Sequence, residues 1–167
     1  MYLGLDLGTS ELKALLCDEH HRIHGIARAP LTAQRPQALW SEQDPQHWID
    51  ACERVMLALA AEHPQAMAQV RAIGLSGQMH GAVLMDKAGT VLRPAMLWND
   101  GRSAAQCDHL TRAVPTLSAI TGNLAMPGFT APKVQWVREH EPQVFAQTSL
   151  ILLPKDYLRW HLSGEAV

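Results

Sequence analysis

Two short apolar runs at the start of the chain restrict the possible folds more than any other pattern in it. They cover residues 2–7 and 12–17, and only residues 8–11 separate them. Parallel neighbours in a sheet need a connection of a dozen or more residues, so these runs can pair only as an antiparallel hairpin. A polar turn at residues 18–21 and an alternating segment at residues 22–31 add a third strand. The chain is therefore predicted to open as a three-stranded antiparallel meander.

A helix and a parallel strand are predicted to follow the meander. Asp44 and Pro45 form a helix start, because Asp can cap the first turn and Pro needs no N–H there. The helix runs to about Glu62, and its apolar residues form one stripe: Trp48, Cys52, Val55 and Leu59. The apolar run at residues 70–75 is typical of a buried strand, which should lie parallel to an earlier strand through a right-handed crossover.

Shorter elements complete the chain. The pattern predicts strands at residues 82–85 and 150–153 and a last helix at residues 155–162 that ends at Gly164. After Ser103 it predicts short helices broken by four prolines: Pro115, Pro127, Pro132 and Pro142. The whole is an α/β fold in which helices pack on the sheet and parallel strands extend the meander.

Composition argues against several classes of function. The 167 residues suffice for one domain, and 14 Lys and Arg against 16 Asp and Glu give a net charge of -2, with no basic run for nucleic acid. No apolar run approaches the roughly 20 residues of a membrane span, and Asp6 stands where a signal sequence would be apolar. We expect a cytoplasmic protein without a membrane partner. Three cysteines without metal-site spacing are expected to be reduced core thiols: Cys17, Cys52 and Cys107.

The segment LGLDLGTS, residues 3–10, contains the residue types of a phosphate site. Gly8 lets the backbone approach phosphate oxygens closely, while Thr9 and Ser10 add hydroxyl and N–H donors. Asp6 can hold a hydrated Mg²⁺, which prefers one or two carboxylates together with substrate phosphates. On these residues alone, a plain hairpin turn is the stronger interpretation. No P-loop or dinucleotide-binding motif is present.

Five segments together resemble the FGGY family of carbohydrate kinases, and the resemblance covers the whole chain. They are Leu5–Ser10, Leu39–Pro45, Gly77–Gly81, Leu97–Arg102 and Gly128–His140. The sequence DLGTS is shared by sugar kinases, Hsp70-like ATPases and actin-like ATPases. Gln-Met-His-Gly is more selective and is most similar to the family members that phosphorylate the ketose D-xylulose. The last segment satisfies the first signature of the family at every fixed position.

The resemblance implies an actin-like ATPase domain with an RNase H-like sheet. In this family two such domains close on each other, ATP binds the first hairpin turn and the second domain, and the γ-phosphoryl group passes to a sugar hydroxyl. Residues 1–167 would be an incomplete N-terminal sugar-binding domain. The rest of that domain, the C-terminal nucleotide domain and the Asp that accepts the proton would lie beyond Val167. The chain alone is therefore expected to be inactive.

The resemblance also implies that ATP and Mg²⁺ are held near the first hairpin. Asp6 would assist the phosphates and hold the metal through water. The γ-phosphate path would be lined by Gly8, Thr9 and Ser10. Lys13 would reach the nucleotide phosphates from the second strand, although a solvent-exposed edge lysine is nearly as plausible. Glu11 stands where the family commonly has a small or hydroxyl residue. A carboxylate beside phosphates is unfavourable unless its side chain points to water, so weaker nucleotide binding is expected.

For the sugar, the resemblance implies a second group of residues: Gln78, Met79, His80, Trp98, Asp100 and Arg102. His80 can exchange hydrogen bonds with sugar hydroxyls, and the thioether of Met79 can pack on the carbon face. Without the surrounding motif, His80 would be a satisfied loop histidine and Met79 a core residue. Trp98 would form a wall of the sugar site. Asp100 and Arg102 either bind the substrate or pair with each other at a helix start.

The expected activity of the parent protein is the ATP-dependent phosphorylation of D-xylulose to D-xylulose 5-phosphate. Two alternatives stay open: another FGGY kinase acting on a different sugar or polyol, and a truncated remnant without catalytic activity. The oligomeric state is also open, with a homodimer as one option.

Overall fold

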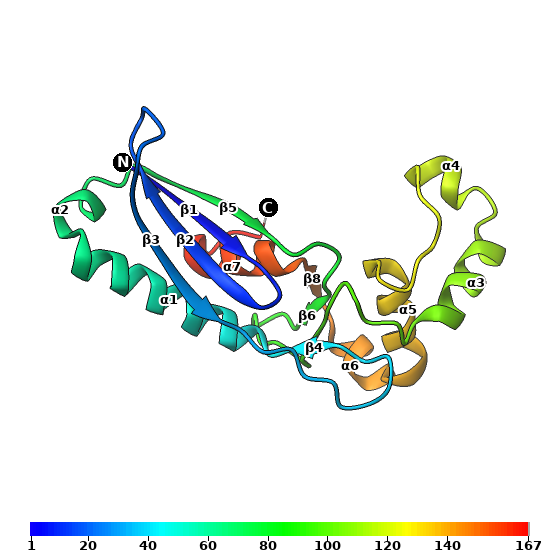
Figure 1. Cartoon of the computed structure of the whole chain (residues 1–167). Helices are drawn as coiled ribbons and strands as arrows, with labels where there is room; N and C mark the ends of the chain where they lie inside the picture. The colour runs from blue at the N-terminus through cyan, green and yellow to red at the C-terminus, as the bar shows by residue number, and fades with distance from the viewer. Residues whose placement is uncertain (167) are drawn as a thin grey trace. The chain divides into compact units, whose positions relative to one another are not determined.

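The computed structural model describes residues 1–166 and divides them into two compact units, shown in Figure 1. We call the first the sheet unit; it contains residues 1–33, residues 45–78 and the segment from Lys155 onward. We call the second the helical unit; it contains Gln34–Asp44 and Met79–Pro154.

A four-stranded sheet forms the centre of the sheet unit. Its strands are β1 (Tyr2–Leu7), β2 (Glu11–Cys17), β3 (Ile23–Pro30) and β5 (Ala72–Gly77), and they lie in the order β3-β2-β1-β5. The pairs β1–β2 and β2–β3 are antiparallel, whereas β1–β5 is parallel. The predicted meander and its extension by a parallel strand are therefore confirmed.

Two helices cover one face of this sheet. They are α1 (Pro45–Glu62) and α7 (Pro154–Ser163), and the rings of Trp48 on α1 and Tyr157 on α7 meet at 6.2 Å. All four residues of the predicted stripe on α1 are buried. The strands contribute alternate residues to this core: Leu3, Leu5, Leu7, Leu12, Ala14 and Leu16. Pro64 ends the α1 pattern and begins the short α2 (Pro64–Met67).

The strand β5 corrects one expectation. It spans Ala72–Gly77 rather than residues 70–75, and its residues are exposed or half-buried instead of buried, with Ile73 42% exposed. The reason is its place at the edge of the described sheet, where only β1 pairs with it. An apolar composition predicted the strand correctly but not how deeply it is covered.

The helical unit contains two short antiparallel strand pairs. One joins β4 (Glu42–Gln43) to β7 (Ala95–Met96), and the other joins β6 (Val83–Met85) to β8 (Leu150–Leu152). Its helices are α3 (Ala104–Ala113), α4 (Leu117–Thr121), α5 (Thr130–His140) and α6 (Pro142–Gln147). A buried cluster unites strands and helix: Ala82, Leu84, Met96, Trp136 and Val137.

One proline does not break a helix as predicted. Pro132 lies in the first turn of α5, where the missing N–H would have no partner within the helix. Pro115 and Pro127 lie between helices, and Pro142 begins α6.

All three cysteines are free thiols, and Cys52 and Cys107 are buried as expected. Cys17 is half-buried and not a core residue, because it lies on the face of β2 that alternates away from the core. Among residues 1–166, no helix combines the length and the apolar character that a membrane span requires.

Candidate functional site

The turn between β1 and β2 is tight because it contains Gly8. The Gly8 N–H donates to the carbonyl oxygen of Glu11 at 3.0 Å. A Cβ atom at Gly8 would lie 3.0 Å from that same oxygen, closer than a side chain normally tolerates. The Ser10 carbonyl accepts a hydrogen bond from the Leu31 N–H at 2.8 Å, which anchors the far side of the turn. The turn is thus fixed by backbone hydrogen bonds, while the Ser10 side chain is exposed.

Gln78 connects this turn to the end of β5. The Gln78 N–H donates to the Leu7 carbonyl at 2.7 Å, and the Thr9 hydroxyl donates to the Gln78 side-chain Oε1 at 3.0 Å. Gln78 is only 7% exposed. Its side chain therefore serves to hold the turn, and it is followed directly in sequence by Met79 and His80.

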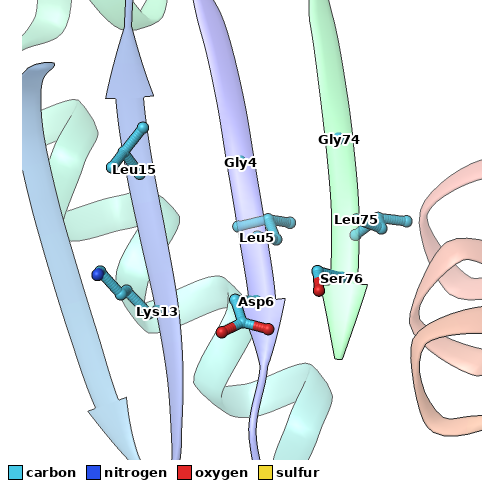
Figure 2. A pocket seen from close by; sticks show the side chains of 8 residues that line it. All are labelled: Gly4, Leu5, Asp6, Lys13, Leu15, Gly74, Leu75 and Ser76. Atoms are coloured by element: carbon cyan, nitrogen blue, oxygen red, sulfur yellow. The ribbon is translucent and has the colours of Figure 1, made fainter. Parts of the chain in front are cut away.

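Asp6 lies on the sheet face that α1 and α7 do not cover. It is exposed, and the strand register places it opposite Lys13 on β2 and Ser76 on β5. Figure 2 shows the residues that line a hollow of about 380 Å³ here, among which Gly4, Asp6, Lys13 and Ser76 lie on this face. The Lys13 side chain extends toward β3 and away from Asp6. Asp6 thus presents a solvated carboxylate, the kind of group that binds hydrated Mg²⁺.

Glu11, the first residue of β2, is paired with a cation. Its carboxylate forms an ion pair with the Arg28 guanidinium across the β2–β3 pair. The charge that departs from the family pattern is therefore balanced on the strand by Arg28.

In the helical unit, His80 has an unusual backbone conformation. Its φ angle is +59°, in the left-handed region that non-glycine residues seldom adopt. The His80 ring lies against the Phe129 ring, with 4.2 Å between their centroids. The His80 carbonyl accepts hydrogen bonds from Lys133 Nζ at 2.7 Å and from the Thr130 hydroxyl at 3.2 Å. The neighbouring Met79 side chain is 62% exposed and is not the core residue that an isolated methionine would suggest.

Trp98 follows β7 and is 48% exposed. Its carbonyl oxygen lies so close to Gly128 that a Cβ atom there would be only 2.3 Å away. Glycine is therefore required for this approach of two backbone segments. An exposed aromatic face on a firmly held loop suits the packing of a sugar ring.

Asp100 and Arg102 are both buried and bind each other. The Asp100 carboxylate accepts hydrogen bonds from Arg102 Nε at 2.9 Å and from the Ser41 N–H at 2.7 Å. The Arg102 guanidinium also contacts Glu42 at 2.8 Å and lies 3.5 Å above the Trp40 ring. The exposed fractions of the Asp100 and Arg102 side chains are 0% and 2%. This geometry favours mutual pairing over direct contact with a substrate.

Lys133, on α5, is fully buried, with an exposed fraction of 0%. Burial lowers the pKa of its ammonium group from 10.5 to about 8, because the charged form loses its hydration. The Asp100 carboxylate acts in the opposite direction and favours the charge, while Arg102 adds to the lowering.

Comparison with known proteins identifies the family. The sequence model that matches residues 1–167 is described as the FGGY family of carbohydrate kinases, N-terminal domain. The chain belongs to the FGGY family of carbohydrate kinases. It is 52% identical to the xylulose kinase of Escherichia coli (strain K12), and the match covers 99% of this chain and 34% of that protein. The chain thus spans about a third of the length of the curated FGGY relatives it matches.

Solved structures confirm the expected fold. A crystal structure from Brucella ovis, described as a xyloylose kinase, matches with a TM-score of 0.96 and 54% identity, covering 98% of this chain and 34% of that one. The xylulose kinase of Rhodospirillum rubrum matches with a TM-score of 0.94 and 30% identity, covering 99% of this chain and 34% of that one. The chain has the actin-like ATPase fold of the FGGY sugar kinases.

The FGGY site residues predicted from sequence fall into two groups, one in each unit. The sheet unit contains Asp6, Gly8, Thr9, Ser10, Lys13 and Gln78, and the helical unit contains Met79, His80, Trp98, Asp100 and Arg102. Sequence reasoning assigned no role to Lys133 or Thr130 beyond their place in the FGGY signature. A signal was available for Lys133: a lysine three and four residues before Trp136 and Val137 lies on the apolar face of a helix.

Proposed function

We propose that the full-length protein containing this chain transfers the γ-phosphoryl group of ATP to D-xylulose and forms D-xylulose 5-phosphate. The observation that carries the proposal is the loop at Met79 and His80, where an exposed thioether is followed by a histidine whose backbone is held by two donors from α5. The similarity of the chain to xylulose kinases supports this choice of sugar.

The sheet unit would supply the phosphate half of the site. Gly8, which has no Cβ, would let the phosphate oxygens come close to the backbone, and Ser10 would offer its backbone N–H and its exposed hydroxyl. Asp6 would hold hydrated Mg²⁺, and its exposed carboxylate on an open sheet face fits that role. When bound, the metal would neutralise charge that develops on the transferring phosphoryl group. Lys13, half-buried on the same face, would add a positive charge for the nucleotide phosphates.

The helical unit would supply the sugar half of the site. The His80 imidazole can donate to one sugar hydroxyl or accept from another, and Met79 would pack on the carbon face of the sugar. Trp98 would add an apolar wall. Asp100 and Arg102 would act indirectly, as the buried pair that supports the Trp98 loop, because their charged atoms are occupied by each other and by Glu42.

Phosphoryl transfer also needs a carboxylate that accepts the proton of the attacking hydroxyl. The family resemblance assigns this role to an Asp beyond residue 167, so the proposal refers to the whole protein. We propose the cytoplasm as its place of action, because ATP is available there and the three free thiols are compatible with a reducing compartment.

A kinase assay on the full-length protein tests the proposal. ATP consumption and sugar phosphate formation would be measured with D-xylulose, L-xylulose, D-ribulose, L-ribulose and glycerol. We expect D-xylulose to give the highest kcat/KM of this panel. A higher value for another sugar or polyol would replace the substrate but keep the family activity. Absence of phosphorylation with every compound would refute the proposal.

A further inference from the structure

Lys133 is a buried cation whose position the proposed reaction does not explain. Its side chain is 0% exposed, and its ammonium group donates to two backbone carbonyl oxygens, those of His80 and Gly128, each at 2.7 Å. Burying an ammonium group is costly unless it is hydrogen-bonded, so a lysine at this place needs a reason. These two hydrogen bonds join separate segments of the helical unit.

The first segment is the loop that carries His80. A φ angle of +59° is unfavourable for histidine, so the surrounding structure must hold it. Residues 129–133, at the start of α5, support His80 at its carbonyl oxygen and at its ring. The hydroxyl of Thr130 and the ammonium of Lys133 both donate to the His80 carbonyl, while Phe129 contacts the His80 ring from the same segment. The direction of the imidazole therefore depends on α5.

The second segment is the loop that carries Trp98. Gly128 approaches the Trp98 carbonyl so closely that no side chain fits between them. The carbonyl of the same Gly128 accepts the second hydrogen bond from Lys133. One ammonium group is thus bonded to the His80 loop and to the residue that packs on the Trp98 loop.

We propose that Lys133 is a positioning residue for the sugar, which ties the backbone of His80 to the backbone of Gly128. The inference rests on the proposed function, because it assumes that His80 and Trp98 contact the sugar. Lys133 itself touches no substrate. An ammonium group suits this place because its hydrogens can serve two carbonyl oxygens at once, whereas an apolar side chain would leave the Gly128 carbonyl without this donor and the His80 carbonyl with Thr130 alone. The nearby Asp100 carboxylate favours the charge.

The test replaces Lys133 in the full-length protein and measures kcat and KM for D-xylulose and KM for ATP. Lys133→Met keeps the length and apolar stem of the side chain but removes its donors. We expect KM for D-xylulose to rise about tenfold or more, because the His80 and Gly128 carbonyls both lose the Lys133 donor and the His80 loop relaxes. We expect kcat to change by less than about threefold and KM for ATP to stay unchanged. Lys87→Met, at an exposed turn, is the matched control and should behave as wild type.

A second pair of variants covers the case in which Lys133→Met does not fold. Thr130→Val removes the other donor to the His80 carbonyl, and Thr130→Ser restores the hydroxyl. We expect Thr130→Val to raise KM for D-xylulose about two- to fivefold and Thr130→Ser to return it toward wild type. If folded Lys133→Met has an unchanged KM for D-xylulose, the proposal is wrong. If that variant does not fold, equal KM values for Thr130→Val and Thr130→Ser overturn it instead.

A spectroscopic measurement separates this proposal from the proposed function. In protein labelled with ¹³C-histidine, the His80 ring signals report its contact with Phe129, with or without sugar. We expect these signals to move in Lys133→Met, or in Thr130→Val if the first variant does not fold, and to stay in place in Lys87→Met. If wild type does not phosphorylate D-xylulose but these signals move, the substrate is wrong and the positioning of His80 stands. If the signals do not move, the positioning role is refuted whatever the substrate.

Discussion

The charged candidate site residues differ in exposure and pairing between the sheet unit and the helical unit. On the open face of the sheet unit, Asp6 is exposed and Lys13 is half-buried, and Figure 2 shows their side chains directed apart. In the helical unit, Asp100 and Arg102 are buried and bound to each other. The difference teaches how the two proposed half-sites would work. Charges proposed to meet phosphates and metal would stay accessible to solvent, whereas charges proposed to support loops are paired within the protein.

The strongest test of this comparison is to remove one buried charge. Arg102→Leu removes the cation that pairs with the buried Asp100 carboxylate and leaves Glu42 with Arg93 alone, and we expect the free energy of unfolding to fall by roughly 3 to 5 kcal/mol. Arg28→Leu is the matched variant, because it breaks the exposed ion pair with Glu11 and should cost less than about 1 kcal/mol. Chemical denaturation of the full-length protein measures both. Equal losses for the two variants would contradict the comparison.

The next effect concerns catalysis at the open face. For Asp6→Asn we expect kcat/KM to fall about 10²- to 10³-fold, because the carboxylate that would hold hydrated metal is lost. Because Asp6 is exposed, its stability contribution should be small, and D-xylulose binding measured by titration calorimetry should be retained. Asp50→Asn, exposed on α1, is the control and should keep full activity. Unimpaired ATP turnover in Asp6→Asn would remove the proposed role of this carboxylate.

Stability against pH sharpens the comparison at Lys133. Burial lowers its pKa from 10.5 to about 8, so between these values the unfolded chain binds more protons than the folded one. The contribution of Lys133 to stability must therefore rise with pH across this window, by roughly 1 to 3 kcal/mol. The free energy of unfolding would be measured for wild type and Lys133→Met at pH 7 and pH 10. Between these pH values it should increase more, or decrease less, for wild type than for the variant. Lys87→Met should show no such difference. Parallel pH profiles for wild type and Lys133→Met would mean that Lys133 is not desolvated as the structure indicates.

The smallest expected effect is at His80. His80→Asn keeps a residue that tolerates a positive φ angle but removes the imidazole, so folding should be nearly unaffected. We expect KM for D-xylulose to rise about tenfold, which corresponds to roughly 1.4 kcal/mol of lost binding. Steady-state kinetics and a thermal melt check the two parts. Wild-type kinetics for His80→Asn would show that this loop does not contact the sugar.

Local patterns in the sequence were enough to predict the framework of the sheet unit. The gap of four residues between the first two apolar runs permitted only a hairpin, and β1 and β2 pair as predicted. The stripe on α1 was equally informative, because Trp48 and Leu59 lie on one helix face and both are buried. In both cases the partners are close in sequence, so spacing alone determines their contact.

The sequence did not predict how β5 and the charged residues of the helical unit are covered. Ile73 belongs to an apolar run but is 42% exposed, since burial depends on which element lies over a strand and not on the strand itself. The contacts of Arg102 come from Trp40, Glu42 and Asp100, two of them about sixty positions away in sequence. No periodicity relates such positions. From the sequence alone, contact with the substrate and pairing with Asp100 are therefore equally plausible for Arg102, and only the structure identifies its partners.

The link between Thr9 and Gln78 has a consequence for ligand affinity. The tip of the hairpin cannot swing away from the end of β5 without breaking both the side-chain bond and the bond from Gln78 to Leu7. Much of the conformational entropy that a flexible loop loses when it closes around a phosphate has already been lost in folding. A nucleotide would therefore bind a turn that is already ordered, and more of the interaction free energy would remain as affinity.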